Sequence, residues 1–333
     1  MVNLKNDYNT IGDKLILEEL INKCSNKYVG YGTDEETKKL NDLVKKLCNM
    51  DVDSYVLSGG TITNVIGLSE MLKYPYEAVI AVDSSHINVH ETGAIEATGH
   101  KIIYTPKIGG KIDISKIEET YNKFTDNHMV LPKALYISNA TELGEVYTLD
   151  ELKEISKICK KLNLYFFIDG ARLPIALVAS KYNISDIASL ADMFYIGGTK
   201  NGLPFGELLI ITNNELKMHF NYLIKNRLGM LAKGFIGAIM FNKYLSDNYY
   251  LKLAKSANDM ADLLRLDLKD YIIYPNNTNQ VFIKLDNKKV DEIKDKIAFE
   301  IWEELHGFKI IRLVSSYNTK KEEILEAIKI IKG

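Results

Sequence analysis

The sequence predicts an α/β protein with a large domain built on a mostly parallel seven-stranded sheet flanked by helices, and a smaller C-terminal α+β domain. Seven short apolar segments rich in β-branched and aromatic residues are typical of strands, and helical segments separate most of them. In the segment from about Tyr271 to Lys332 this alternation gives way to a mixed pattern of strands and helices. The 333 residues are enough for two domains with buried cores.

Two amphipathic helices are expected to open the chain, at about Asp13–Lys27 and Thr33–Asn49. The strands that follow are predicted at Tyr55–Ser58, Ala78–Asp83, Lys101–Tyr104, Ala134–Ser138, Tyr165–Ile168, Met193–Ile196 and Leu208–Thr212. The main helices between them are predicted at Thr61–Lys73, Ile114–Phe124 and Leu149–Leu162. The last strand is expected to be antiparallel, because the loop Gly202–Phe205 is too short for a parallel crossover.

Long helical patterns then run from about Asn213 to Leu268, and the segment from about Tyr271 to Lys332 reads as strand, strand, helix, strand, helix. We therefore expect the large domain at residues 1–245, with the N-terminal helices included, and the small domain at residues 246–333.

Composition and missing motifs exclude several classes of protein. The net charge of −2 argues against a nucleic-acid partner, and no apolar run is long enough to cross a membrane. The cysteines Cys24, Cys48 and Cys159 form neither a disulfide framework nor a metal motif, so we expect no metal and a reduced, cytoplasmic setting. The single GxG, Gly30–Gly32, lies between helices and lacks a third glycine, which argues against a dinucleotide oxidoreductase.

In an open α/β sheet, ligands bind at the carboxyl ends of the strands. Asp169 directly follows a buried strand, where an ionised carboxylate needs a partner. A helix cap or an ion pair with Arg172 would also explain it. Lys200 follows the next strand in a glycine-rich turn, where buried surroundings would turn it into a nucleophilic amine. The alternative is a surface lysine.

The run Gly59-Gly60-Thr61 joins a strand to a helix whose free backbone amides suit a phosphate, although a simple tight turn would have the same pattern. Together, these three signals are the parts that pyridoxal phosphate needs. The lysine forms an imine, the aspartate keeps the pyridine nitrogen protonated so that the ring acts as an electron sink, and the helix N-terminus takes the phosphate.

These motifs resemble the threonine aldolases, which belong with the β-eliminating lyases to the aspartate-aminotransferase-type enzymes that depend on pyridoxal phosphate. The resemblance runs along nearly the whole chain. Its most specific segments are Val29–Asp34, Gly59–Asn64, Ser85–Ala94, Thr141–Gly144, Ile168–Arg172, Gly197–Gly202 and Ile310–Tyr317.

The resemblance implies a role for each residue of the cofactor site. Lys200 would hold the cofactor as a Schiff base, Asp169 would pair with the pyridine nitrogen, and Arg172 would lie near the ring hydroxyl. The phosphate would be held by the amides of Gly59, Gly60 and Thr61, and His86 would stack on the ring. Lys233 is a candidate for the phosphate across a subunit boundary, with a solvated helix lysine as the alternative.

The resemblance also assigns the substrate side. Glu91 would help to hold a water or the substrate hydroxyl, and His128 would lie near that hydroxyl. Arg312 would bind the amino-acid carboxylate, with Arg172 close by. The other histidines, His90, His100, His219 and His306, match nothing and are read as non-catalytic.

The implied activity is retro-aldol cleavage of threonine or allo-threonine, which are β-hydroxy-α-amino acids, to glycine and acetaldehyde by a homodimer or homotetramer. The base would be His86, His128 or a water held by Glu91. The alternatives are β-elimination or a phenylserine-type aldolase on the same scaffold, and a degenerate protein that only binds pyridoxal phosphate.

One segment departs from the family pattern. The match of Asn6-Asp7-Tyr8 ends at Asn9, where the family has a serine that helps to hold the substrate carboxylate. An asparagine amide can still donate a hydrogen bond there. Lys14 stands where the family has a proline that begins the first helix.

Overall fold

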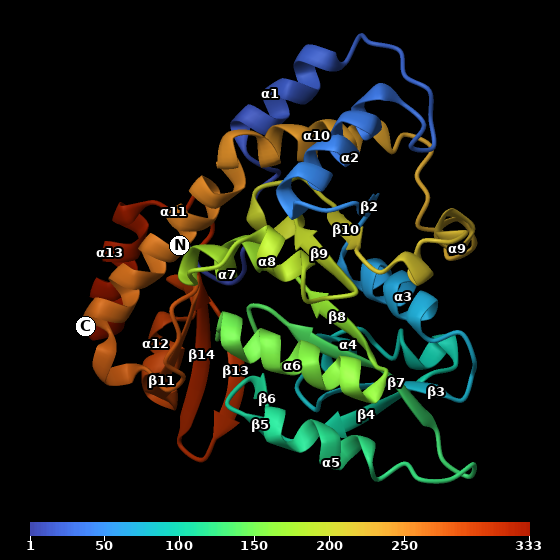
Figure 1. Ribbon diagram of the computed structural model, residues 1–333. Coiled ribbons are helices and arrows are strands. Elements are labelled where there is room, and N and C mark those ends of the chain that lie inside the picture. Colours follow the sequence, from blue (N-terminus) through green and yellow to red (C-terminus); the bar gives the residue numbers. More distant parts are fainter.

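The computed structural model describes all 333 residues, which are arranged around a seven-stranded sheet (Figure 1). In spatial order its strands are β2 (Asp53–Leu57), β10 (Glu207–Ile211), β9 (Met193–Gly197), β8 (Tyr165–Asp169), β7 (Leu131–Ser138), β3 (Glu77–Val82) and β4 (Lys101–Thr105). All neighbours from β9 to β4 pair in parallel, whereas β10 is antiparallel to both β9 and β2. The predictions of a mostly parallel sheet and an antiparallel last strand are confirmed.

Alternate residues of these strands face opposite sides of the sheet, so the chain builds one hydrophobic cluster on each side. Ile168 and Phe194 belong to one cluster, and Phe167 and Tyr195 to the other. The first side is covered by α2 (Glu35–Cys48), α6 (Leu149–Leu162), α7 (Leu173–Ala179), α8 (Ile184–Ala188) and α10 (Phe235–Leu245). The second side is covered by α3 (Gly60–Met71), α4 (His86–Val89) and α9 (Phe220–Asn226).

Local capping explains where several helices begin. Thr148 and Glu151 form a reciprocal capping box at the start of α6, which matches the predicted range. The first helix, α1 (Lys14–Lys23), begins without the family's proline because the Asp13 side chain accepts a hydrogen bond from the backbone of Leu15 at 3.0 Å. α1 ends at Lys23, four residues before the predicted end at Lys27.

The segment between β4 and β7 is less helical than predicted. It contains the two-residue strands β5 (Lys107–Ile108) and β6 (Lys111–Ile112), and the helix α5 (Ile117–Tyr121) is shorter than the predicted Ile114–Phe124.

The C-terminal part is a small α+β unit, as predicted. Its three-stranded antiparallel sheet has the order β11 (Gln280–Asp286), β14 (Phe308–Val314) and β13 (Glu300–Leu305). The helices are α11 (Tyr249–Asp267), α12 (Asn287–Ile293) and α13 (Lys321–Lys332). The predicted order of elements was wrong here, because α12 directly follows β11 and because β13 was missed. Three of the six residues of β13 are glutamates, which hides an edge strand from a search for apolar segments.

The N-terminus lies beside this C-terminal unit (Figure 1). β1 (Val2–Asn3) pairs in parallel with β12 (Ile297–Ala298), and Val2 and Leu4 are buried in the same hydrophobic cluster as α11 and α13. The domain boundary after residue 245 stays a prediction. The first four residues nevertheless pack with the small unit rather than with the large sheet.

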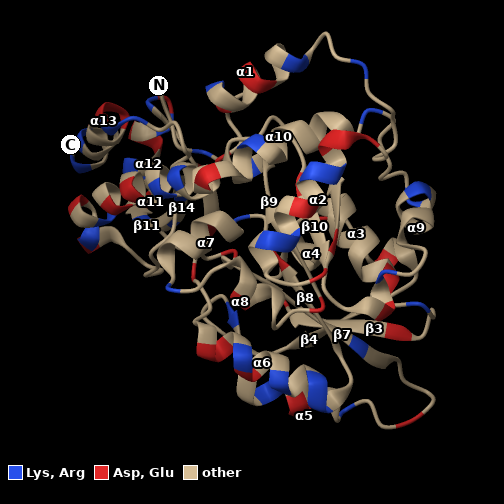
Figure 2. Cartoon of the chain, turned by 45° about the horizontal axis from the view of Figure 1, so that its top comes forward, with Lys and Arg blue, Asp and Glu red and all other residues tan.

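The surface carries charges of both signs. Lys and Arg alternate with Asp and Glu over most helices (Figure 2), as the net charge of −2 suggests. None of the helices combines the length and the apolar character that crossing a membrane would require.

Candidate active site

The topology brings the predicted cofactor residues to one edge of the sheet. Asp169 is the last residue of β8, and Lys200 lies in a short helical turn after the neighbouring strand β9. The Asn201 side chain donates to the carbonyl oxygens of Ala171 at 3.0 Å and Gly197 at 2.9 Å. The turn that carries Lys200 is thereby tied to the turn that follows Asp169.

The Asp169 carboxylate is buried, and both of its oxygens accept hydrogen bonds. Its Oδ2 accepts hydrogen bonds from Tyr136 Oη at 2.5 Å and Asn64 Nδ2 at 3.1 Å, and its Oδ1 accepts one from the backbone of Ala171 at 2.9 Å. Burial raises the pKa of Asp169, but the charge of His86 and the hydrogen bonds outweigh it, so that the pKa is held below its usual value. The site therefore keeps a buried carboxylate in its charged form, as a partner of a pyridinium nitrogen must be.

His86 and Glu91 form a pair next to this carboxylate. His86 donates from Nδ1 to Oε1 of Glu91 at 2.8 Å, and the same oxygen accepts from Asn64 Nδ2 at 2.7 Å. Because a carboxylate only accepts, Nδ1 carries the proton in this contact. The second oxygen of Glu91, Oε2, is buried and has no partner.

Lys200 is partly buried among charged groups. Burial and the Arg172 charge lower its pKa, although Asp7, Asp169 and Glu207 act in the opposite direction. An amine whose proton is less tightly held is a better nucleophile, as imine formation requires. Lys200 is therefore not a fully solvated surface lysine, and its role in imine formation stays a prediction.

The phosphate cradle predicted at Gly59, Gly60 and Thr61 is an uncapped helix start. Gly59 precedes α3 in an extended conformation, and no side chain caps the helix. A Cβ at Gly60 would meet only the hydroxyl of Tyr195, at 3.6 Å. The first amides of α3 are therefore free to bind an anion.

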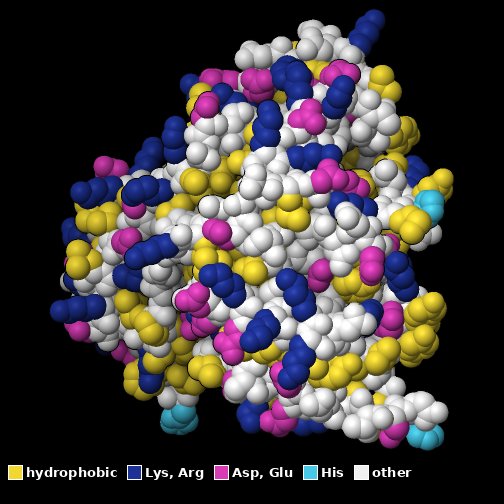
Figure 3. Space-filling model, in the orientation of Figure 1, with side chains coloured by type: hydrophobic (Ala, Val, Ile, Leu, Met, Phe, Trp, Pro, Cys, Tyr) yellow, Lys and Arg dark blue, Asp and Glu magenta, His cyan; other side chains and the backbone are white.

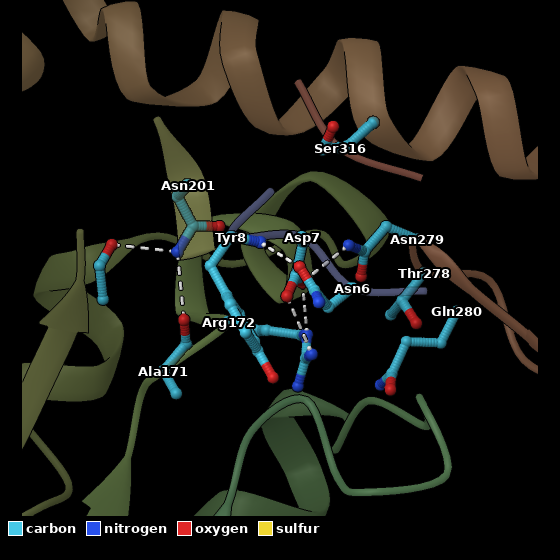
Figure 4. A network of polar contacts seen from close by, with 12 residues as sticks. Asn6, Asp7, Tyr8, Ala171, Arg172, Asn201, Thr278, Asn279, Gln280 and Ser316 are labelled. Atoms are coloured by element: carbon cyan, nitrogen blue, oxygen red, sulfur yellow. Dashed lines mark hydrogen bonds and ion pairs between the residues drawn. The ribbon is translucent and has the colours of Figure 1, made fainter. Parts of the chain in front are cut away.

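Arg172 is held by a residue that carried no predicted role (Figure 4). It donates from Nε and Nη2 to the two oxygens of Asp7 at 2.7 and 3.0 Å, and Asn279 donates to the same carboxylate at 2.9 Å. Both charged groups are buried. The side edge of the guanidinium is therefore occupied, and Nη1 is the group of Arg172 left for a ligand.

Arg312 projects from the small sheet toward the same region. It donates to Gln280 Oε1 at 3.0 Å and to Glu300, and its guanidinium lies 4.9 Å from the centre of the Trp302 ring. Burial and the charge of Arg172 lower the pKa of Arg312, whereas Glu300 and Asp7 raise it. The charges of Arg172 and Asp7 are thus close enough to act on Arg312.

Two predicted residues are not brought to this site within one chain. His128 is exposed in the loop before β7, at the edge where that strand begins. The eight residues of β7 put about 25 Å between this edge and the one that carries Asp169. Lys233 is exposed in the turn before α10, beside the segment of Tyr31, whose backbone donates to Ala232 O at 3.0 Å.

The departing N-terminal segment does pass the site. Asn9 is half-buried and lies between Asp7 and Asp13, whose backbone donates to Gly202 O at 2.7 Å beside the Lys200 turn. His90, to which no role was assigned, also lies close, with its ring centre 5.5 Å from that of His86.

Sequence reasoning missed the groups that hold the predicted ones in place. These are Asp7, Asn64, Tyr136, Glu142 and Glu207. Glu142 accepts hydrogen bonds from the His86 backbone at 3.0 Å and Ser138 Oγ at 2.6 Å, and burial raises its pKa. Asn64 and Glu142 lie in segments whose motifs were identified, but these motifs did not indicate which groups the two side chains would hold.

Comparison with known proteins gives a consistent result. The sequence model of the β-eliminating lyase family matches residues 23–288. The chain is 31% identical over 274 residues to a low-specificity L-threonine aldolase of Pseudomonas sp., covering 80% of this chain and 79% of that protein. It is 30% identical to the Pseudomonas aeruginosa protein of the same name, covering 79% and 78% of the two chains.

Solved structures agree with this result. A threonine aldolase of Leishmania major superposes with a TM-score of 0.97 at 40% identity, over 100% of this chain and 99% of that one. An aspartate aminotransferase of Thermus thermophilus superposes with a TM-score of 0.73 at 14% identity, over 99% and 90% of the two chains, which shows the shared fold alone. The chain therefore belongs to the β-eliminating lyase family and is similar to its threonine aldolases.

Proposed function

We propose that the protein is a pyridoxal-phosphate-dependent aldolase that cleaves threonine or allo-threonine to glycine and acetaldehyde. The observation that carries this proposal is the meeting of Lys200 with a charged, buried Asp169 on neighbouring strand ends, beside the His86–Glu91 pair. The similarity to low-specificity L-threonine aldolases supports this reaction over β-elimination.

The donor groups of the site fit pyridoxal phosphate. Lys200 would hold its aldehyde carbon, Asp169 its pyridine nitrogen, and the free amides of α3 its phosphate. When bound, the cofactor supplies an electron sink for the electrons of the breaking Cα–Cβ bond. The Asp169 carboxylate keeps that sink effective, because its hydrogen bonds hold it in the charged form.

The side chains would orient the substrate and move its protons. Arg312 would bind the α-carboxylate, which fixes the position of the amino acid across the site. Nε2 of His86 would accept the proton of the β-hydroxyl while Glu91 holds Nδ1, Cβ would leave as acetaldehyde, and Cα would take up a proton to give glycine. We assign the base to His86 rather than His128, since His128 lies at the other edge of the sheet.

The test is acetaldehyde release from L-threonine and L-allo-threonine by the cofactor-loaded protein. Lys200→Ala should lower turnover on the order of a thousandfold or more and abolish the visible absorbance of the lysine-bound cofactor, because no other lysine replaces this amine. Lys160→Ala, at an exposed lysine of α6, is the matched control and should leave both unchanged. A Lys200→Ala variant with normal turnover would exclude the proposal.

Absence of acetaldehyde from a wild-type protein that shows this absorbance would point instead to another reaction of the family. Ammonia release from L-serine or L-threonine would then identify β-elimination, and benzaldehyde release from phenylserine would identify the aldolase with a bulkier substrate.

We further propose a homo-oligomer, a dimer or a tetramer, in a reduced, cytoplasmic setting. Large apolar side chains are exposed on and beside α9, among them Tyr222 (77%), Met218 (69%) and Leu228 (88%), and hydrophobic atoms are visible over α9 at the right margin of Figure 3. Exposed apolar patches of this kind are typical of association surfaces. All three cysteines are unpaired, which supports the reducing setting.

A further inference from the structure

Arg312, which is expected to bind the substrate carboxylate, already forms an ion pair with the carboxylate of Glu300. Arg312 and Glu300 are direct cross-strand partners in the antiparallel pair of β14 and β13, so their side chains share one face of the small sheet. Gln280 lies on the neighbouring strand β11 and accepts a hydrogen bond from Nη1 of Arg312 at 3.0 Å. The opposite face of the sheet is apolar and packs on α11 and α13.

The pairing leaves part of the arginine unsatisfied. Nη2 of Arg312 donates to Oε2 of Glu300 and Nη1 to Gln280, but Nε is buried and has no partner. Nε and Nη2 are the side edge of a guanidinium, the same edge that Arg172 presents to both oxygens of Asp7. Glu300 uses one half of that edge, so a carboxylate that reached both nitrogens would be bound better than Glu300 is.

The two partners differ in their freedom to move. The Arg312 side chain is 12% exposed, whereas the Glu300 side chain is 38% exposed at the start of the edge strand β13. A shift of register follows at Ile301 and Glu303, which leaves Trp302 outside the regular pairing. Glu300 can turn into solvent at little cost, because water replaces its hydrogen bond, while Arg312 stays fixed by its surroundings.

We propose that Glu300 is an internal substitute for the substrate carboxylate, which holds Arg312 while the site is empty and gives up Nη2 when an α-carboxylate arrives. This proposal rests on the proposed function, since it concerns the carboxylate of the same amino-acid substrate. A ligand needs an anionic group to take Nη2 from Glu300, so the exchange favours amino acids over the corresponding amines. It also keeps a half-buried guanidinium partly paired between turnovers.

The surroundings of Arg312 provide a reporter for this exchange. Trp302 is the single tryptophan of the chain, and its ring lies under the Arg312 guanidinium. Its centre is 6.3 Å from that of His90, which in turn lies 5.5 Å from that of His86. A change of partner at Arg312 therefore alters the environment of one identifiable fluorophore next to the active site.

The first experiment is kinetic and uses the cofactor-loaded protein. Glu300→Gln keeps the size of the side chain and a neutral acceptor for Arg312, but it removes the competing charge. We expect KM for L-threonine to fall about twofold to fivefold, the range that a partly exposed ion pair represents, and kcat/KM to rise accordingly. The control is Glu304→Gln. Glu304 lies on β13 like Glu300, but it is an exposed partner of Lys309, so this variant should leave KM unchanged. A KM that rises or stays constant in Glu300→Gln would mean that Glu300 braces Arg312, and would overturn the proposal.

The second experiment needs no turnover and thus separates this proposal from the proposed function. Glycine, which carries an α-carboxylate, should shift the tryptophan emission of the wild-type holoenzyme, and ethanolamine, which lacks the carboxylate, should not. In Glu300→Gln the glycine-induced shift should be smaller and the Kd for glycine about twofold to fivefold lower. Equal responses to glycine and ethanolamine, or an unchanged Kd, would overturn the proposal even if threonine were cleaved normally. A protein that fails to cleave threonine but shows the glycine-specific shift would refute only the proposed reaction.

Discussion

At the scale of single residues, the site depends on buried charges that each have a defined partner. Asp7 and Arg172 form a bidentate ion pair at 2.7 and 3.0 Å, and both side chains are almost excluded from solvent. Charges in such surroundings are costly unless they are paired and hydrogen-bonded. The segment around Asp7 therefore has a structural task that is independent of its departure from the family after Tyr8.

Asp7→Asn should destabilise the protein strongly. The substitution leaves the Arg172 charge buried with only a neutral acceptor, so we expect the free energy of unfolding at pH 7 to fall by about 3 kcal/mol or more. Asp262→Asn removes the exposed partner of Arg265, a pair at 2.7 Å, and should cost less than about 1 kcal/mol. Urea unfolding of both variants measures the two losses of unfolding free energy. Equal losses would mean that the Asp7–Arg172 pair contributes no more than a surface pair.

At the scale of elements, the direction of β10 explains a buried glutamate that has no obvious partner in the sequence. Because β10 is antiparallel, its first residue, Glu207, lies opposite Gly197 and Leu57 at the edge where the parallel strands end. Its Oε2 accepts a hydrogen bond from the Gly198 backbone at 2.8 Å. Burial raises the pKa of Glu207 to about 7, although this hydrogen bond and the Lys200 charge lower it.

This glutamate predicts a dependence of stability on pH. The pKa of Glu207 in the folded protein is above its usual value of 4.5, so the folded state binds its proton more tightly than the unfolded state does. The resulting stability is fully present below pH 4.5 and is lost as the pH rises toward about 7. Glu207→Gln should remove this loss, and the difference in unfolding free energy between variant and wild type should grow from pH 4.5 to pH 7. Urea unfolding across this range measures it, and a constant difference would contradict the prediction.

At the start of α1, an aspartate cap takes the place of the family's proline. The family's proline is absent at Lys14, but Asp13 caps α1 and also accepts a hydrogen bond from Tyr249 Oη at 2.9 Å. Proline and an aspartate cap both favour the first turn of a helix, the first by restricting φ and the second by satisfying a free amide. The helix therefore begins at the expected position despite the changed sequence.

At the scale of the whole molecule, the termini and the exposed apolar surface matter most. β1 ties the first residues to β12 of the small unit, and the chain then crosses to the large sheet past Asp7. The segment thus links the two parts of the molecule through the site itself.

The apolar surface at α9 predicts self-association. Light scattering should give the wild-type protein a molar mass of twice or four times 37.8 kDa. Leu228→Asp places a charge on this surface and should shift the mass toward the monomer. Leu266→Asp, at a leucine of α11 that is also largely exposed, should not. A wild-type mass of 37.8 kDa, or an oligomer that is insensitive to Leu228→Asp, would refute the proposed surface.

The sequence by itself determined the parallel sheet, the reversed β10 and the convergence of Asp169 and Lys200, because these follow from local periodicity, loop length and the rule that parallel strands end at one edge. Only the tertiary structure decided which charges meet. Asp7 and Arg172 are 165 residues apart, Glu300 lies on an edge strand that composition concealed, and His128 precedes β7 at the edge of the sheet opposite to Asp169. The partner of a side chain depends on the placement of distant elements and on side-chain direction, and neither is contained in the periodicity of a single segment.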